Sequence, residues 1–243
     1  MRKVPELTIF FWIIKLLTTG MGETASDFLV RMIDPPIAVG IGAIGLLASL
    51  VLQFRIKRYN AFAYWFTVSM VAIFGTMIAD VLHVGLGVPY IVSTLGFSIT
   101  LAIIFASWYK IEKTLSIHSI TTTRRELFYW ATVMATFALG TALGDMTATT
   151  LKMGYLDSGI LFAALFIIPA VMYFEFKLSE VLTFWFAYIT TRPLGASFAD
   201  WIGRSKELGG VGFGTGEISL VLVVLIILFV GYLAITKKDV KYK

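Results

Sequence analysis

Four stretches of this chain decide its fold: WIIKLLTTGMGETASD at residues 12–27, WFTVSMVAIFGTMIAD at 65–80, WATVMATFALGTALGD at 130–145 and WFAYITTRPLGASFAD at 185–200. Each begins with Trp, has Gly ten residues later and ends with Asp fifteen residues after the Trp. One register shared by three residue types indicates an internal repeat, and such repeats build a fold from copies of one unit. We therefore expect four equivalent aspartates: Asp27, Asp80, Asp145 and Asp200.

The composition predicts that these repeats cross a membrane. Of the 243 residues, 58% are hydrophobic and 14% are charged, and the mean hydropathy is +0.86. Soluble domains are only about half apolar. Long apolar runs recur at residues 37–54, 90–109, 160–174 and 218–235, and a helix of about 20 apolar residues crosses the ~30 Å of hydrocarbon in a bilayer. With two spans in each repeat, the expected fold is all-α with about eight transmembrane helices and the lipid bilayer as partner.

The basic residues between the apolar runs predict the orientation in a cell membrane. Lys- and Arg-rich loops stay in the cytoplasm, and fourteen basic residues fall on one side against four on the other. Both termini are therefore expected to be cytoplasmic, which also accounts for the net charge of +5 without nucleic acid as a partner. The fourteen are Arg2, Lys3, Arg55, Lys57, Arg58, Lys110, Lys113, Arg124, Arg125, Lys177, Lys237, Lys238, Lys241 and Lys243, and the four are Arg31, Lys152, Arg204 and Lys206.

The repeats are expected to be parallel copies. Each contains two spans, so all four enter the membrane in the same direction and are related by an axis along the membrane normal. The arrangement predicted is four two-helix units around a pseudo-fourfold axis. A longer polar stretch at residues 116–126 divides the chain into two four-helix halves, residues 1–115 and 116–243. The oligomeric state is left open by the sequence.

The motifs GETASDF, GTALGD with GYLDSGILFA, and TRPLGASFADW carry a family resemblance. The chain resembles an uncharacterised prokaryotic family of integral membrane proteins with four tandem repeats, each with two transmembrane helices and a recurring Trp. The resemblance covers nearly the whole chain and implies this repeat architecture. It implies no activity, so the function is argued from the residues.

Polar residues form a stripe along the first helix of each repeat. They fall 3, 7, 11 and 15 residues after the Trp, and residues four apart lie above one another on a helix. Charges at membrane depth are costly, face protein or water, and indicate function. The candidate ion-binding residues are Lys15, Glu23, Asp27, Asp80, Asp145, Arg192 and Asp200.

These residues predict a transporter or channel for a small cation, with possible coupling to protons. An Asp at a helix C-terminus opposes the helix dipole, which favours a role in attracting a cation. Oxygen ligands suit Na⁺, K⁺, Mg²⁺ or Mn²⁺, and the expected cation ligands are Glu23, Asp27 and Asp200. Because Lys15 and Glu23 occur only in the first repeat and Arg192 only in the fourth, the site is expected between those repeats. Asp80 and Asp145 are expected to serve access of the cation to this site more than its binding.

Other interpretations remain open. Lys15 and Arg192 could bind the carboxylate or phosphate of an organic anion, or the protein could be a membrane scaffold without transport. An enzyme is not expected, because neither HExxH nor GxSxG occurs, and no cofactor beyond a bound cation is predicted. The absence of cysteine excludes disulfides and thiolate chemistry. The glycines are expected to allow close approach of helices, and the four Trp residues to form an interfacial belt.

Overall fold

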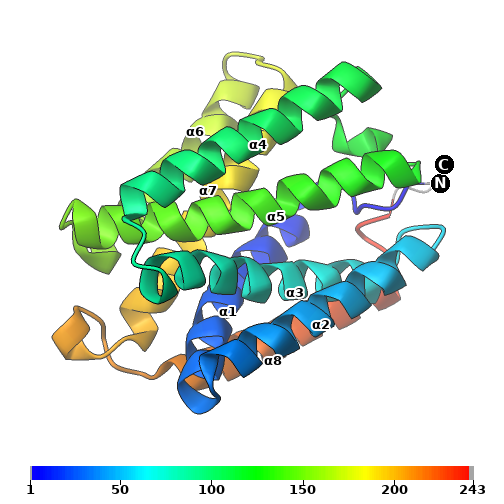
Figure 1. Ribbon diagram of the computed structural model, residues 1–243. Coiled ribbons are helices and arrows are strands. Elements are labelled where there is room, and N and C mark those ends of the chain that lie inside the picture. Colours follow the sequence, from blue (N-terminus) through cyan, green and yellow to red (C-terminus); the bar gives the residue numbers. More distant parts are fainter. Residues whose placement is uncertain (1, 241–243) are drawn as a thin grey trace.

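The computed structural model describes residues 2–240, and helices make up its secondary structure (Figure 1). Lys241 and Lys243, counted among the cytoplasmic basic residues, lie outside this range. In residues 2–240 there are eight α-helices: α1 (Ile9–Met32), α2 (Pro35–Arg55), α3 (Ala61–Asp80), α4 (Tyr90–Glu112), α5 (Thr123–Asp145), α6 (Gly154–Phe174), α7 (Glu180–Gly203) and α8 (Thr215–Thr236).

Short helical turns of other types extend or join these helices. Two π-helical turns continue α3 and α5 beyond their aspartates, η1 (Val81–Gly85) and η3 (Met146–Thr150). Two 3₁₀ turns, η2 (Ile117–Ser119) and η4 (Lys206–Leu208), lie in the connections before α5 and α8. Local sequence sets several helix starts: the Asn60 side chain accepts the N–H of Ala63, the Thr122 side chain accepts that of Arg125, and Pro35 begins α2, where its missing N–H costs nothing.

The first helices of the four repeats form a closed ring. α1 packs against α3 and α7, and α5 packs against the same two helices. At each junction the repeat glycine faces the residue seven places after the Trp in the next repeat, and an added methyl group would come closer than 3.0 Å to it. The pairs are Gly22 with Ala72, Gly75 with Phe137, Gly140 with Arg192, and Gly195 with Thr19. The same contact recurs four times around the ring, so the predicted role of the glycines is confirmed.

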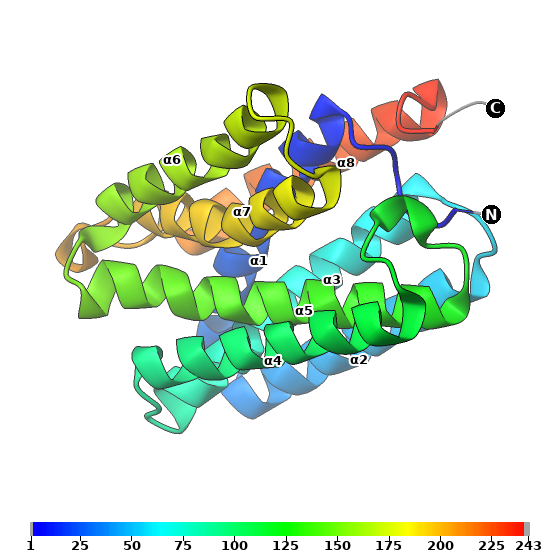
Figure 2. The ribbon, with the colours of Figure 1, turned by 90° about the horizontal axis from the view of Figure 1, so that it is seen from above.

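The even-numbered helices interlock the repeats. Each packs mainly on the odd helix that follows it, α2 on α3, α4 on α5 and α6 on α7, and α8 returns to α1. Viewed from above, α2 and α4 lie on one side, α6 and α8 on the other, and the odd helices between them (Figure 2). Helix packing in the ring therefore continues across the boundary between residues 115 and 116, where the sequence divides the chain into two halves.

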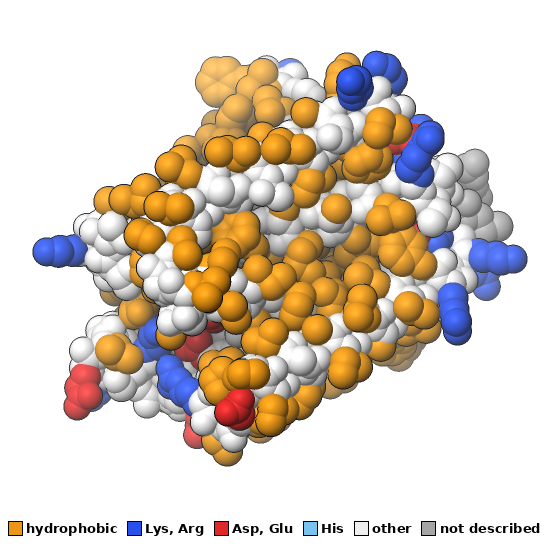
Figure 3. Space-filling view, viewed as in Figure 1, with side chains coloured by type: hydrophobic (Ala, Val, Ile, Leu, Met, Phe, Trp, Pro, Cys, Tyr) orange, Lys and Arg blue, Asp and Glu red, His pale blue; other side chains and the backbone are white. Residues whose placement is uncertain are grey.

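The outer surface is strongly apolar. Hydrophobic side chains cover the face seen in Figure 3 over α2 to α5, and Lys and Arg gather at its two ends. Within residues 2–240, six helical segments are long and apolar enough to cross a membrane, the exceptions being α1 and α7. Those two carry most of the charged stripe, including Lys15, Glu23 and Arg192. The helices are thus compatible with a multi-pass membrane protein.

The molecule has two distinct ends. The termini end holds the N- and C-termini (Figure 1) and the loops at 56–60, 113–122 and 175–179. The carboxylate end, opposite it, holds the four aspartates that close the repeat motif. At the termini end, the ring is filled by the aromatic residues that precede each Trp: Phe11, Tyr64, Tyr129 and Phe184, all buried. The hydroxyls of Tyr64 and Tyr129 are hydrogen-bonded to each other.

The N-terminal segment covers this aromatic layer. Lys3 Nζ lies 2.5 Å from Glu126 Oε2, and the Lys3 amide donates to the carbonyl of Ile120 at 3.1 Å. The prediction of a Trp belt facing the membrane interface is wrong for Trp65, Trp130 and Trp185, which are buried, and Trp12 is half-buried. Their rings pack against the aromatic layer, so they help to seal the termini end.

Candidate functional site

The polar stripes of the four odd helices all face the ring axis. Their residues form four layers from the termini end to the carboxylate end, named here by distance from the repeat Trp, and every member is buried except half-buried Asp80. The +3 layer is Lys15, Val68, Val133 and Tyr188; the +7 layer is Thr19, Ala72, Phe137 and Arg192; the +11 layer is Glu23, Thr76, Thr141 and Ala196; the +15 layer is Asp27, Asp80, Asp145 and Asp200. The axis thus becomes more acidic toward the carboxylate end.

Lys15 occupies an aromatic cage in the +3 layer. Its Nζ lies 3.9 Å from the ring centroid of Phe137 and 4.2 Å from that of Tyr188. No described residue accepts a hydrogen bond from this ammonium group, so cation–π attraction replaces hydrogen bonding. Lys15 is therefore separated from the carboxylates with which the sequence grouped it.

Arg192 joins all four helices at the centre of the ring. Its Nη1 donates to the Thr19 carbonyl at 2.9 Å, and its Nη2 lies 2.6 Å from Glu23 Oε2. The same Nη2 donates to the hydroxyls of Thr141, at 2.7 Å, and Thr76. A guanidinium group offers five donors in a fixed plane, and here one plane ties α7 to α1, α3 and α5. Arg192 fills the axis between the aromatic half and the acidic half.

Two further arginines stand at the carboxylate end, both 19 residues after a repeat Trp. Arg31 Nη2 lies 3.3 Å from Asp27 Oδ2. Arg204 Nε lies 2.7 Å from Asp200 Oδ1, and its Nη2 lies 3.4 Å from Asp27 Oδ2. Burial disfavours the charge on Arg204, but the Asp200 and Asp27 carboxylates outweigh this effect and raise its pKa. Asp27 and Asp200 are therefore both paired with a permanent cation.

The aspartates of repeats two and three lack such partners. In the described chain, no Lys or Arg forms an ion pair with Asp80 or Asp145. The nearest basic group is His83, whose Nδ1 lies 4.0 Å from Asp145 Oδ2. His83 belongs to the π turn η1, and π turns inside α-helices occur frequently at functional sites.

Two carboxylate clusters result, and Asp145 belongs to both. Glu23, Asp145 and Asp200 each offer an oxygen within 4.8 Å of the others, and so do Asp80, Asp145 and the ring nitrogen of His83. These are called the inner cluster and the outer cluster below. Of the predicted cation ligands, Glu23 and Asp200 meet in the inner cluster, with Asp145 beside them, whereas Asp27 is held by the two arginines.

Sequence reasoning missed three residues of this site. Arg31 and Arg204 continue the polar stripe by one more turn, so the four-residue spacing could have identified them. His83 follows Asp80 by three residues, a spacing that also keeps two side chains on one face of a helix. A stripe defined by a spacing of four residues alone does not include it.

The comparison with protein families gives one result. The model described as Repeat of Unknown Function (DUF347) matches the chain four times, at residues 10–59, 63–114, 128–178 and 183–239. No curated protein and no solved structure matches the chain. The four matches confirm the resemblance drawn from the Trp-to-Asp motifs.

Proposed function

Because the chain belongs to the DUF347 repeat family, whose description names no activity, we propose a function from its site: a multi-pass membrane carrier that exchanges a small cation for protons. The observation that carries the proposal is the pair Asp80 and Asp145, two carboxylates on the ring axis without a Lys or Arg partner among the described residues.

The apolar surface supports a membrane location. Large exposed apolar patches are rare on soluble monomers, whereas exposed Ile and Leu side chains here run along α2, including Ile37, Ile41, Ile44 and Leu47. The charges of α1 and α7 face the axis and would not meet lipid. These observations support a span for each of the eight helices, and the fourteen-to-four basic bias supports cytoplasmic termini.

The carboxylates support a cation as the transported species. A buried carboxylate must be paired, protonated or bound to a cation, because an isolated charge away from water is very costly. Arg192 partners Glu23, and Arg31 and Arg204 partner Asp27 and Asp200, which leaves the two carboxylates named above. A cation that enters this end would take the place of the protons on these groups, which gives exchange its physical basis.

The closed termini end supports a carrier rather than an open channel. Between the carboxylates and that end lie Arg192, the caged Lys15 and the aromatic layer. A cation that entered from the carboxylate end would meet a permanent positive charge at Arg192. Passage then requires a rearrangement of the ring, as in alternating access.

The organic-anion alternative finds less support in this geometry. The two terminal nitrogens of the Arg192 guanidinium already donate to Glu23, Thr19, Thr76 and Thr141. Lys15 is enclosed by aromatic rings. An anion approaching from the carboxylate end would first meet five acidic side chains.

The test is ion flux into proteoliposomes, measured with Na⁺, K⁺, Mg²⁺ and Mn²⁺ in turn. We expect Asp145→Asn to abolish flux of the transported ion, since Asp145 belongs to both clusters. The matched control is Asp157→Asn, which removes an exposed aspartate of α6 at the same end of the molecule and should leave flux unchanged. Equal flux through the parent and Asp145→Asn would contradict the proposal, as would flux that falls equally in both variants.

A further inference from the structure

The outer cluster has the composition of a transition-metal site. We infer that Asp80, His83 and Asp145 bind a divalent transition-metal ion of the Mn²⁺, Fe²⁺, Co²⁺ and Zn²⁺ class, at the point where ions enter the axis. This inference rests on the proposed cation carrier and names the class of ion that it moves.

Hydrogen bonding prepares His83 to be a ligand. Its Nε2 lies 2.5 Å from Ser93 Oγ, and the Ser93 hydroxyl donates to the Tyr90 carbonyl at 3.0 Å. When the serine proton is used in that bond, Ser93 accepts the Nε2–H, and the lone pair of the imidazole is left on Nδ1. Metal-binding histidines are typically fixed in this way, with the second ring nitrogen donating to an oxygen.

The free nitrogen of His83 points into the cluster. Its Nδ1 is buried without a hydrogen-bond partner in the described chain, and the side chain is 2% exposed. The Tyr90 ring packs against the imidazole with centroids 4.2 Å apart. Since an unsatisfied buried polar atom carries a desolvation cost, a ligand at Nδ1 accounts for this orientation.

The spacing of the three ligand atoms fits one ion. All lie within 4.8 Å of one another. Metal–ligand bonds of about 2.0–2.2 Å place two ligand atoms no more than about 4.4 Å apart, so small side-chain rotations would complete the site. His83 lies in the π turn that continues α3, whereas repeats one and four remain α-helical past their aspartates and have Arg31 and Arg204 beside them instead.

The ligand set selects the class of ion. Imidazole favours Fe²⁺, Co²⁺ and Zn²⁺ over Na⁺, K⁺ and Mg²⁺, which prefer oxygen alone, and Mn²⁺, which oxygen ligands also suit, is the weakest binder of the transition-metal class. Asp145 is shared with the inner cluster, so an ion bound at the mouth can pass to Glu23 and Asp200 while it keeps one ligand. The outer cluster is thus an entry site and a filter for the carrier.

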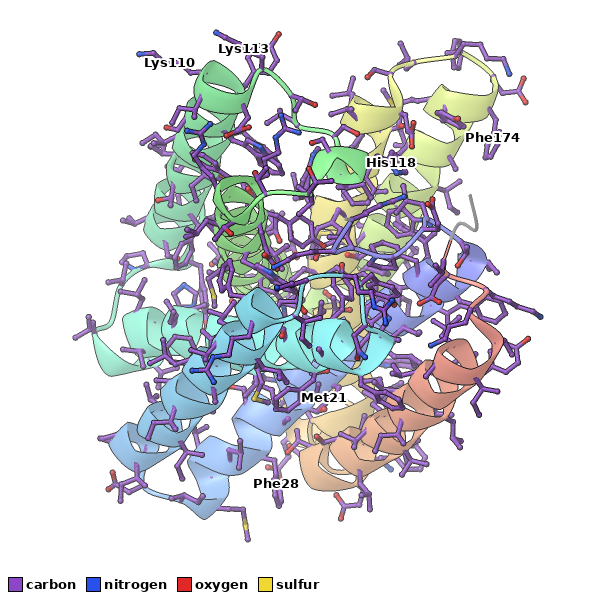
Figure 4. The ribbon with its side chains drawn as sticks, turned by 90° about the vertical axis from the view of Figure 1, so that its right-hand side faces the viewer. Met21, Phe28, Lys110, Lys113, His118 and Phe174 are labelled. Carbon is purple, nitrogen blue, oxygen red and sulfur yellow. The ribbon has the colours of Figure 1, made fainter. Side chains whose placement is uncertain are left out.

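Binding of Co²⁺ to the purified full-length protein in detergent tests the inference, with visible d–d absorption as the readout. The parent should bind Co²⁺ with a spectrum typical of mixed nitrogen and oxygen ligands, and His83→Ala should lose that spectrum. The matched control is His118→Ala. His118, at the termini end (Figure 4), is hydrogen-bonded to Glu180 at 2.6 Å and should not affect the spectrum. It is the second of the two histidines in the chain.

A second variant, Ser93→Ala, tests the inference if His83→Ala fails to fold. Ser93→Ala keeps the imidazole but removes its orienting partner, and should weaken Co²⁺ binding by about 10- to 100-fold, the usual effect of an outer-shell change. Nitrogen coupling in pulsed EPR of bound Mn²⁺ should be present in the parent. Co²⁺ binding that is unchanged in folded His83→Ala, or absent from the parent, would overturn the inference. In the latter case, Na⁺ or K⁺ flux that still depends on Asp145 would leave the proposed carrier standing.

Discussion

Arg192 is the residue on which the site depends most. A buried guanidinium is tolerable only with its partners in place, because a charge left alone in the interior costs far more than the pair contributes. Here the partners come from all three other helices of the ring. Lys15 is the contrasting case, a buried cation whose neighbours are aromatic rings. The two basic residues listed together as candidate ion-binding residues therefore differ: Arg192 binds a carboxylate, Glu23, and Lys15 lies apart from the carboxylates.

Arg192→Met should destabilise the protein strongly, because it leaves Glu23 buried without its cation. The cost expected for breaking a buried pair is about 3–5 kcal/mol, which thermal unfolding in detergent would detect as a large fall in Tm. The double variant Arg192→Met with Glu23→Gln should recover a good part of that loss. A double variant no more stable than Arg192→Met alone would show that the Arg192–Glu23 pair is not what holds the centre together.

At the scale of the helices, the repeat glycines fix how closely the ring can close. Gly140 lies against the stem of Arg192, where a methyl group would come closer than 3.0 Å. Small residues commonly allow such approach between membrane helices. Each glycine therefore helps to position the +7 residue of the next repeat, and the glycine of repeat three positions Arg192.

Gly140→Ala should lower stability and move Arg192 out of its hydrogen bonds. The added methyl group would meet Arg192 Cβ, which is fixed by the backbone of α7 and cannot rotate away. The control is Gly231→Ala in α8, where nothing lies within 4 Å of the added methyl group. There the substitution should stabilise the helix by roughly 0.5–1 kcal/mol, because alanine loses less conformational freedom. Thermal unfolding of the two variants should thus give shifts of opposite sign. Shifts of equal size and the same sign would contradict the close packing of the ring.

The sequence predicted the elements that follow a regular period and missed those that depart from it. The Trp-to-Asp register predicted four equivalent helices, and the spacing of Glu23 and Asp27 predicted a polar face. The even helices pack on the following repeat. No local sequence pattern predicts this packing. His83 was missed because the stripe was defined by a spacing of four residues, whereas His83 follows Asp80 by three. The buried Trp65 was assigned to the interface because Trp is common both there and in aromatic cores.

The whole molecule is a ring with two unlike ends. Four identical copies of one unit would form a fourfold-symmetric ring. The stripe residues differ between the repeats, however, and break this symmetry. Repeats one and four supply Lys15, Glu23 and Arg192, while repeats two and three supply Asp80 and Asp145, which have no Lys or Arg partner within residues 2–240. The termini end is sealed by aromatic rings and by the N-terminal segment. In the proposed carrier, a cation would therefore enter at the carboxylate end only, until the ring rearranges.

Simultaneous recording of cation uptake and internal pH in proteoliposomes tests this account most directly, using whichever ion the flux measurements select. Exchange at Asp80 and Asp145 predicts that the internal pH rises as the cation enters, with both signals lost in Asp145→Asn and retained in Asp157→Asn. Cation entry through the parent with no accompanying proton movement, or traces that are the same for the parent and Asp145→Asn, would contradict it.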